Sequence, residues 1–351
     1  MADFDFIEAA GARDGLHLID IVRLHANTMP TKSIAVKMPT SRTLFYNTGS
    51  ISAVTWTGGI KVNLVRDLAA VNRHNVAHTT SKGVPLVYRC AVTIMPTLVT
   101  EQYNRIFAED PNMIQVAEII HAPNTWITRN AVVKTHAARE NMFKQQGVKK
   151  SERGAYSRTL RPTWSASPDT FLTPRKGSTS GGAAYAMGEW DYSALKADDG
   201  DLSHLRLVGD SGILSLYLDS RKQISYDSNS GTDATGSDNP DDTNQPVDSN
   251  ILRQLLSPTL GISSKDDEVT ALARDEQDNP PYSLDNNGDH TDPVLAGRQY
   301  IGGMAGISHT AVYDIPLGIF EMKALNAYID TGANATLPFE FKVEVLGIYE
   351  M

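Results

Sequence analysis

The stretch LPFEFKVEVLGIY, from Leu337 to Tyr349, decides the fold class. Apolar residues occupy every second position, namely Phe339, Phe341, Val343 and Val345. The charged residues Glu340, Lys342 and Glu344 lie between them. A period of two is that of a strand with one face buried and the other in water. We therefore predict a half-buried antiparallel strand over these residues.

A second apolar run, VYDIPLGIFEMK from Val312 to Lys323, precedes this strand. The linker from Ala324 to Thr336 is rich in residues that favour turns, namely Asn326, Asp330, Gly332 and Asn334. Two long strands joined by such a loop predict a last hairpin that completes a β-domain.

The rest of the chain is also predicted to be mostly β. Short apolar runs begin at Leu16, Ser33, Ser50, Gly59, Pro85, Met113, Thr125, Leu205 and Ile307. Turn residues at Asn47 to Ser50 and at Gly209 to Gly212 are expected to separate strands. Runs at this spacing, with no helical period before Val99, are typical of a sandwich or barrel of antiparallel strands.

Helices are expected to be few and short. Thr100 to Asp110 begins with an N-cap residue and is followed by proline, which predicts one helix. Ala131 to Gln146 starts with β-branched residues and continues with good helix formers, and we favour a helix that ends at Gly147. Two further short helices are predicted at Asn250 to Leu256 and Asp266 to Arg274.

Composition limits the classes of function. The formal net charge of −9 gives the molecule no bulk attraction for nucleic acid or anionic membranes, so any such contact must be local. The single cysteine, Cys90, excludes an internal disulfide and is expected to be buried and inert. The acidic start lacks the features of a signal peptide, and no run approaches the roughly 20 apolar residues that span a bilayer, so we expect a soluble protein.

A basic segment from Arg129 to Lys176 stands out within this acidic chain. It carries an excess of about eight positive charges, and Trp126, Tyr156, Trp164 and Phe171 are interleaved with it. Such residues can neutralise phosphates and stack on unpaired bases, although an exposed helix face would have the same composition. The candidate nucleic-acid-binding residues are Lys144, Lys149, Lys150, Arg153, Arg158, Arg161, Arg175 and Lys176.

Two segments of unusual composition interrupt the predicted strands. The basic segment and the Gly/Ser-rich hinge after it, residues 129–182, are read as an insertion between strands. Residues 226–292 are rich in aspartate and poor in apolar residues, which predicts a solvated surface excursion. Within it Asp285, Asn287 and Asp289 have the spacing of calcium ligands, but an ordinary polar turn is the favoured interpretation.

No catalytic arrangement is found in the sequence. The chain has no nucleophile elbow, zinc-protease motif, phosphate-binding loop or dinucleotide fingerprint, and its nine histidines share no spacing. The glycines of YIGGMAGIS are followed by neither lysine nor a helix start, so a glycine-rich turn is expected there. We therefore predict a protein that is not an enzyme and that has no cofactor and no metal site.

The second half of the chain resembles a family of viral proteins. The order GEWDYSAL, LVGDSGILSLYLDSR, a polar excursion, HTAVYDIPLGIFEMKA and FEFKVEVLGIYE is similar to capsid proteins of circular Rep-encoding single-stranded DNA viruses, such as bacilladnavirus-like and related aquatic viruses. The resemblance covers mainly Gly188 to Tyr349. It implies an eight-stranded antiparallel jelly roll and self-assembly into an icosahedral shell around single-stranded DNA.

One feature departs from that family. Many such proteins begin with an arginine-rich arm, whereas Asp3, Asp5 and Glu8 make this start acidic. Either the genome is held by the basic segment, on the inside of the shell or at a subunit contact, or packaging depends little on charge.

The resulting expectation is an all-β, single jelly-roll capsid domain over residues 1–351. Its partners would be copies of itself and packaged single-stranded DNA, and its location the virion. The alternative is a jelly-roll carbohydrate-binding or adhesion module, in which Trp126, Trp164 or Trp190 would stack on sugar, with or without calcium. An enzyme on a β-sandwich is a third class, for which no catalytic set can be named.

Overall fold

The computed structural model describes residues 38–51, 57–95, 113–165, 171–177, 182–197, 200–202, 204–209, 212–221, 252, 291–302, 309–328 and 337–351. These residues all belong to one compact unit, Lys37–Met351. The predicted strands from Leu16 and Ser33, the helices at Thr100 to Asp110 and Asp266 to Arg274, and nearly all of residues 226–292 lie outside the described residues.

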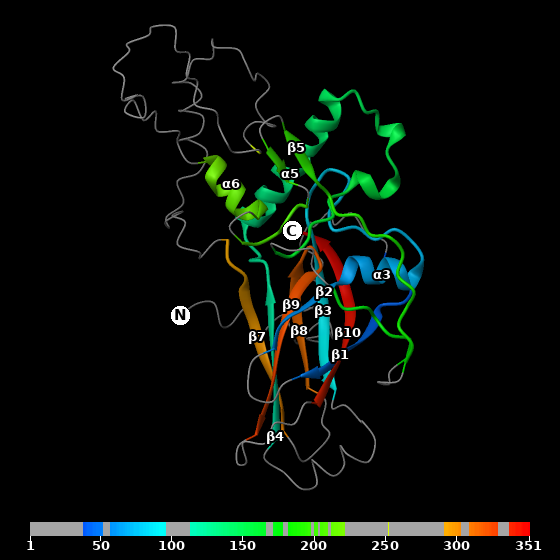
Figure 1. Ribbon diagram of the computed structural model, residues 1–351, viewed down its shortest axis with the longest axis vertical. Coiled ribbons are helices and arrows are strands. Elements are labelled where there is room, and N and C mark those ends of the chain that lie inside the picture. Colours follow the sequence, from blue (N-terminus) through cyan, green and yellow to red (C-terminus); the bar gives the residue numbers. More distant parts are fainter. Residues whose placement is uncertain are drawn as a thin grey trace, which may run out of the picture. The chain divides into compact units, whose positions relative to one another are not determined.

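The described chain is mostly β and forms two four-stranded antiparallel sheets, as a β-sandwich requires (Figure 1). The first sheet has the order β1 (Thr43–Ile51), β10 (Leu337–Glu350), β3 (Leu86–Met95), β8 (His309–Pro316). The second has the order β2 (Thr57–Asn63), β9 (Ile319–Tyr328), β4 (Met113–His121), β7 (Val294–Gly302). The prediction of an antiparallel sandwich is thus confirmed.

The remaining elements lie largely between β4 and β7 in the chain. They are α5 (Trp126–Gln145), two 3₁₀ turns at Lys150–Glu152 and Ala155–Arg158, the short strand pair β5 (Leu195–Ala197) and β6 (Gly200–Leu202), and α6 (Ile213–Arg221). One further helix, α3 (Leu64–Asn72), follows β2. The basic segment is therefore part of an insertion in the sandwich.

Strand β10 is the predicted terminal strand, and it pairs with β1 on one side and β3 on the other. Phe341, Val343 and Val345 are at most 1% exposed, which confirms the alternation read from the sequence. The ring of Tyr46 on β1 stacks on Phe341 with centroids 5.0 Å apart. One outward residue departs from the pattern, because Glu340 is buried and accepts a hydrogen bond from Asn47.

The predicted last hairpin is wrong. β9 and β10 are consecutive in the chain but lie in different sheets. The run Val312 to Lys323 is likewise not one strand: it turns at Leu317 and Gly318, both with positive φ, and passes from β8 in one sheet to β9 in the other. An alternating pattern marks a strand but not its partner, so the crossing could not be read from it.

Two predictions made from local residues before Val99 are also wrong. The run from Gly59 is a strand as far as Asn63, as predicted, but the absence of a helix before Val99 is wrong, because α3 begins at Leu64 and the Asn63 side chain accepts a hydrogen bond from the Arg66 amide at its N-terminus. Asn47 to Ser50 is not a turn between strands but a bulge within β1. Short apolar runs fit a buried helix as well as a strand, and tertiary burial decides between them.

The inserted region is more helical than predicted. Thr125 to Lys134 is not a strand, because α5 starts at Trp126, although the helix does end just before Gly147 as expected. The residues from Ile213 onward, predicted as a strand, form α6. Both helices bury β-branched or aliphatic residues against each other, and this burial outweighs their local β propensity.

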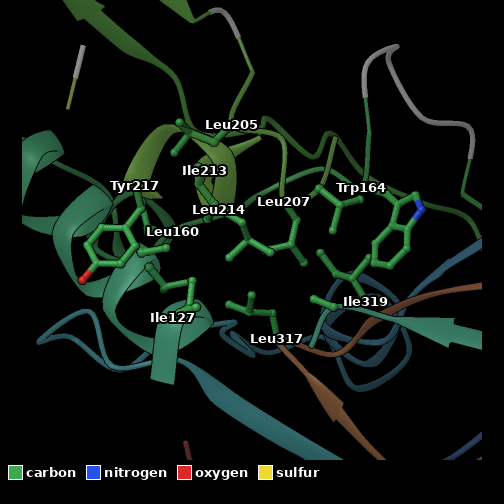
Figure 2. Packing of buried hydrophobic residues seen from close by; sticks show 14 of the residues in the cluster. Ile127, Leu160, Trp164, Leu205, Leu207, Ile213, Leu214, Tyr217, Leu317 and Ile319 are labelled. Carbon is green, nitrogen blue, oxygen red and sulfur yellow. The ribbon is translucent and has the colours of Figure 1, made fainter. Parts of the chain in front are cut away.

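A second apolar core joins these helices to the end of the sandwich (Figure 2). It contains side chains from α5, α6, two extended segments and the β8–β9 turn, among them Ile127, Leu214, Leu207, Leu317 and Ile319. Trp164 lies in it at 1% exposure, and its Nε1 donates to Glu321 on β9 at 2.7 Å. The insertion is therefore packed on the sandwich rather than tethered to it.

Buried polar groups join the parts of the sandwich. Nε2 of Gln299 on β7 donates to the Val92 carbonyl on β3 at 3.2 Å and to the Tyr313 hydroxyl on β8 at 3.1 Å, so it links the two sheets. Burial raises the pKa of the Cys90 thiol, and Cys90 is buried as expected.

The Asp67 carboxylate on α3 is fully buried. The Tyr46 hydroxyl donates to it at 2.6 Å, and Nε of Arg66 donates at 2.9 Å. Burial raises the pKa of Asp67 from 3.8 to about 6, against the opposing effect of Arg66. Between these values the folded state holds a proton that the unfolded chain releases, so this group makes stability fall as the pH rises.

We therefore expect wild type to lose about 3 kcal/mol of unfolding free energy relative to Asp67→Asn between about pH 4 and about pH 7. Denaturant unfolding of both proteins across this range measures the difference, in which other titrating groups cancel. A difference independent of pH would contradict the raised pKa.

The β8–β9 turn gives a second prediction. A Cβ on Gly318, where φ is 66°, would lie 2.9 Å from the Tyr88 ring, and the Tyr88 hydroxyl is bonded to the Ala77 carbonyl at 2.6 Å. Gly318→Ala is expected to cost about 2 kcal/mol more than Gly147→Ala. Gly147 is the matched control because its φ is 70° and a Cβ there meets nothing within 4 Å. Equal losses in equilibrium unfolding would show that the ring moves aside.

Candidate nucleic-acid interface

Helix α5 is the support of the basic segment. Its buried residues, among them Ile127, Ala131 and Ala138, pack in the second core, while Arg129, Lys134 and Lys144 are exposed. The Thr135 hydroxyl donates to the Ala131 carbonyl at 2.7 Å within the helix. The helix therefore presents cations on the side that faces away from the core.

Arg153, one of the predicted binding residues, is engaged inside the protein. It is 9% exposed and donates two hydrogen bonds to Glu140 of α5, at 2.6 and 2.9 Å. Its guanidinium also lies 4.6 Å from the centroid of the Phe143 ring, and Arg139 lies 4.8 Å from the same ring. Its charge is matched by Glu140, so Arg153 serves the fold and is not presented to a phosphate.

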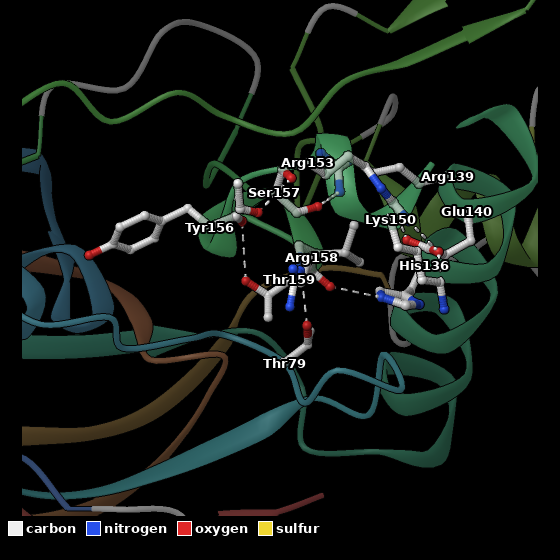
Figure 3. A network of polar contacts seen from close by, with 12 residues as sticks. Thr79, His136, Arg139, Glu140, Lys150, Arg153, Tyr156, Ser157, Arg158 and Thr159 are labelled. Carbon is white, nitrogen blue, oxygen red and sulfur yellow. Dashed lines mark hydrogen bonds and ion pairs between the residues drawn. The ribbon is translucent and has the colours of Figure 1, made fainter. Parts of the chain in front are cut away.

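The chain after Arg153 is fixed to α5 by hydrogen bonds to its backbone (Figure 3). Nη1 of Arg139 donates to the Ser157 carbonyl at 2.6 Å, and Nε2 of His136 lies 3.3 Å from the Arg158 carbonyl. The Leu160 amide donates to the Thr79 hydroxyl at 3.2 Å. These contacts hold residues 154–160 in one conformation beside the helix.

The pKa shifts in this network follow from hydrogen bonding and burial. The hydrogen bonds from Arg153 lower the pKa of Glu140, which therefore stays ionised. Burial lowers the pKa of His136, so its imidazole is neutral near pH 7. Burial, with the nearby Arg161 and Arg153, lowers the pKa of Arg139 to about 10, and this guanidinium keeps its charge.

Four of the predicted residues are exposed near one another in the chain: Lys144, Lys149, Lys150 and Arg158. They occupy the last turn of α5 and the two 3₁₀ turns after it. Lys150 is 83% exposed and only 3.9 Å from Glu140, which is a weak surface contact. These four cations are available to a ligand.

The other three predicted residues lie elsewhere. The guanidinium of Arg161 sits over two rings, 5.8 Å from the centroid of Tyr156 and 5.4 Å from that of Trp190. The Arg175 amide donates to the Phe45 carbonyl of β1 at 2.8 Å, and Lys176 lies 5.6 Å from the Tyr185 ring. The structure therefore places Arg175 beside β1 and Lys176 beside Tyr185, and neither lies on α5.

Two residues beside this surface were not predicted. Arg66 on α3 and Trp190 in the extended chain both approach Arg161 or Tyr156 only through the tertiary fold. Trp190 was considered only as a sugar-stacking ring, and Arg66 follows the run from Gly59 to Val65 and was given no role. No local signal in the sequence connects them with the basic segment.

No group of three or more His, Cys, Asp or Glu side chains suited to a metal ion occurs in the part of the chain that the structure describes. The calcium-like spacing at Asp285 to Asp289 lies outside that part. None of the described helices is long and apolar enough to cross a membrane.

The pairing of Arg153 predicts different effects for neighbouring cations. Arg153→Ala removes two charged hydrogen bonds and should lower the free energy of unfolding by about 2 kcal/mol. Lys150→Ala, at a side chain that is 83% exposed, should change it by less than about 0.5 kcal/mol. Thermal and denaturant unfolding of the two variants measures both values, and equal losses would contradict the structural role of Arg153.

Comparison with known proteins gives no family for this arrangement. No protein-family model, curated protein or solved structure matches the chain.

Proposed function

We propose that this chain is a single jelly-roll capsid protein that assembles with copies of itself into an icosahedral shell around single-stranded DNA. The observation that carries the proposal is the order of the strands in the two sheets. The exposed cations after α5 and the apolar side chains on edge strands add to it, as does the sequence resemblance.

The strand order supports the jelly roll. The two large sheets contain eight described strands, β1 to β4 and β7 to β10, and the first of them along the chain pairs with the last, β1 with β10. The second pairs with the seventh, β2 with β9, the third with the sixth, β3 with β8, and the fourth with the fifth, β4 with β7. This is the pairing of one long hairpin, and the contacts of β10 with β3 and of β9 with β4 roll it into two sheets.

Jelly rolls occur in capsid proteins, lectins and other proteins, so the fold alone does not assign a function. The exposed side chains must decide between these functional classes. Six large hydrophobic side chains are exposed among the described residues, and three of them, Val294, Leu295 and Tyr300, lie on the edge strand β7. A fourth, Val312, lies on β8, the edge of the other sheet. Apolar groups on sheet edges favour contacts between subunits.

The carbohydrate-binding alternative has less support. Of its three candidate rings, Trp164 is buried and bonded to Glu321, and Trp126 packs against the second core. Only Trp190 lines a surface hollow. A single ring offers little of the flat aromatic surface that sugar stacking uses.

The proposal assigns packaging of nucleic acid to the four exposed cations Lys144, Lys149, Lys150 and Arg158. They are exposed, whereas Arg153 is buried and bonded to Glu140, so these four can replace the counterions of a phosphate backbone. On this proposal the protein has no catalytic role.

Negative-stain electron microscopy of the purified chain tests the proposal, with the ratio of absorbance at 260 and 280 nm measured on the same sample. Closed spherical particles with an absorbance ratio above that of pure protein are expected. A monodisperse monomer under all salt and pH conditions would reject the capsid assignment and favour a binding module.

Within such particles, Lys149→Ala with Lys150→Ala should lower the retained nucleic acid and leave the shells intact. Each lost phosphate contact should also reduce the salt dependence of single-strand binding by about 0.7 in the slope of log K against log salt. Arg153 is left unchanged because its loss would confound packaging with stability.

The matched control is Lys82→Ala with Arg73→Asn, which removes two exposed cations after α3. Asparagine is chosen because Arg73 has a φ of 52°, which asparagine tolerates. Equal loss of nucleic acid in both variants would assign packaging to total charge and contradict the proposed site.

A further inference from the structure

A cleft of about 160 Å³ lies beside the exposed cations. Its walls come from three separate parts of the chain, namely helix α3, the chain around the second 3₁₀ turn, and the extended residues 187–190. Its principal side chains are Arg66, Tyr156, Arg161, Glu189 and Trp190. Two guanidinium groups and two aromatic rings therefore meet in one hollow.

Arg161 is the central cation of the cleft. It is half-buried, and its guanidinium lies over the rings of Tyr156 and Trp190, which meet edge to face with centroids 5.9 Å apart. Within the described residues this guanidinium donates no hydrogen bond, and Arg161 is bonded only through its backbone: its amide donates to the Ser193 hydroxyl at 3.0 Å, and its carbonyl accepts from the Ser193 amide at 3.0 Å. A partly desolvated guanidinium whose N–H groups have no acceptor favours the binding of an anion.

The neighbouring arginine is held differently. Arg66 donates to Asp67 at 2.9 Å and to the Leu172 carbonyl, so its position is fixed and its charge is largely neutralised. It lines the cleft as a hydrogen-bond donor of defined orientation. Burial lowers the pKa of Arg161 and the nearby Asp191 carboxylate opposes this, so the charge of Arg161 is offset only in part. Arg161 therefore supplies the less neutralised guanidinium, and Arg66 supplies geometry.

The aromatic wall suits a planar group. Tyr156 is 37% exposed, and Figure 3 shows its ring pointing away from the Arg139 network. Base stacking on an exposed aromatic ring contributes about 1 to 3 kcal/mol for each base. Phosphate on a planar guanidinium and a base on a ring are the two contacts that single-strand binders combine.

The size of the cleft restricts the ligand. Pockets for whole small molecules hold roughly 300 to 1,000 Å³, so a hollow of about 160 Å³ holds only one unit of a larger chain. Glu189 also lines it, and its exposed carboxylate repels a phosphate at that wall. The phosphate is thereby directed to the Arg161 side.

We infer that this cleft binds one nucleotide of a single-stranded nucleic acid, with the phosphate on Arg161 beside Arg66 and the base on Tyr156. The inference rests on the proposed packaging function and names a specific contact for it. The exposed cations after α5 would then bind the backbone on either side of that nucleotide.

The test uses the purified full-length chain and a fluorescent oligothymidylate of about ten nucleotides, within the site sizes of single-strand binders. Anisotropy gives Kd over a range of salt concentrations. Arg161→Gln and Tyr156→Ala should each raise Kd about tenfold. Arg161→Gln should also reduce the salt slope by about 0.7, whereas Tyr156→Ala should leave that slope unchanged.

Conservative variants separate binding from folding. Tyr156→Phe keeps the ring and should bind as wild type, and Glu189→Gln should tighten binding because it removes the repelling charge. The control Lys82→Ala removes an exposed cation away from the cleft and should change Kd less than about threefold. Wild-type affinity and salt slope in both Arg161→Gln and Tyr156→Ala would overturn the inference.

The outcomes also separate this inference from the capsid proposal. Particles that form while both cleft variants bind normally would reject the cleft and leave the capsid proposal standing. A monomer whose binding is lost in both variants would keep the nucleotide site and reject the shell. Binding of neutral glycans, lost in Tyr156→Ala, without binding of the oligothymidylate would assign the cleft to carbohydrate and overturn the inference.

Discussion

The structure depends on the insertion of β10 between β1 and β3. An interior strand has hydrogen-bonding groups on both edges, and each buried group must find a partner. For β10 those partners come from two strands near the start of the described chain, so the end of the chain must return to its beginning. This return places β9, β8 and β7 in turn opposite β2, β3 and β4, because each is joined to the next by the chain. The two-sheet architecture follows from that one closure.

The turn at Leu317 and Gly318 connects the sandwich to the inserted region that carries α5 and α6. Leu317 and Ile319 belong both to the sandwich and to the core beneath α5 and α6. His78 adds a polar contact at the same place, since its Nδ1 lies 2.6 Å from the Leu317 carbonyl. Burial lowers the pKa of His78 to about 4, so the imidazole is neutral and donates this hydrogen bond. The helix that carries the cations is thus positioned by the sandwich.

Charge in the inserted region is divided between structure and surface. Arg139 and Arg153 turn inward, where Phe143, Glu140 and the Ser157 carbonyl satisfy them. The lysines between them in the chain, Lys144, Lys149 and Lys150, are exposed. A basic segment in an otherwise acidic chain therefore holds two groups of cations: Arg139 and Arg153 hold it against α5, and Lys144, Lys149, Lys150 and Arg158 are exposed. The cleft at Arg161 stands at the boundary between the two groups.

Local sequence determined the features that depend on local period and composition. The alternation of β10, the strands β3, β4 and β8, the end of α5 near Gly147 and the burial of Cys90 were all readable from neighbouring residues. Strand partners were not readable, because pairing is a contact between distant segments and an alternating pattern fits any partner with a complementary face. For the same reason the apolar run at α6 was mistaken for a strand and the helix α3 was not predicted, because tertiary burial decides for helix there. The pairing of Arg153 with Glu140, and the meeting of Arg66, Arg161 and Trp190 in one cleft, exist only in three dimensions, since composition counts charges but does not say which of them are already neutralised.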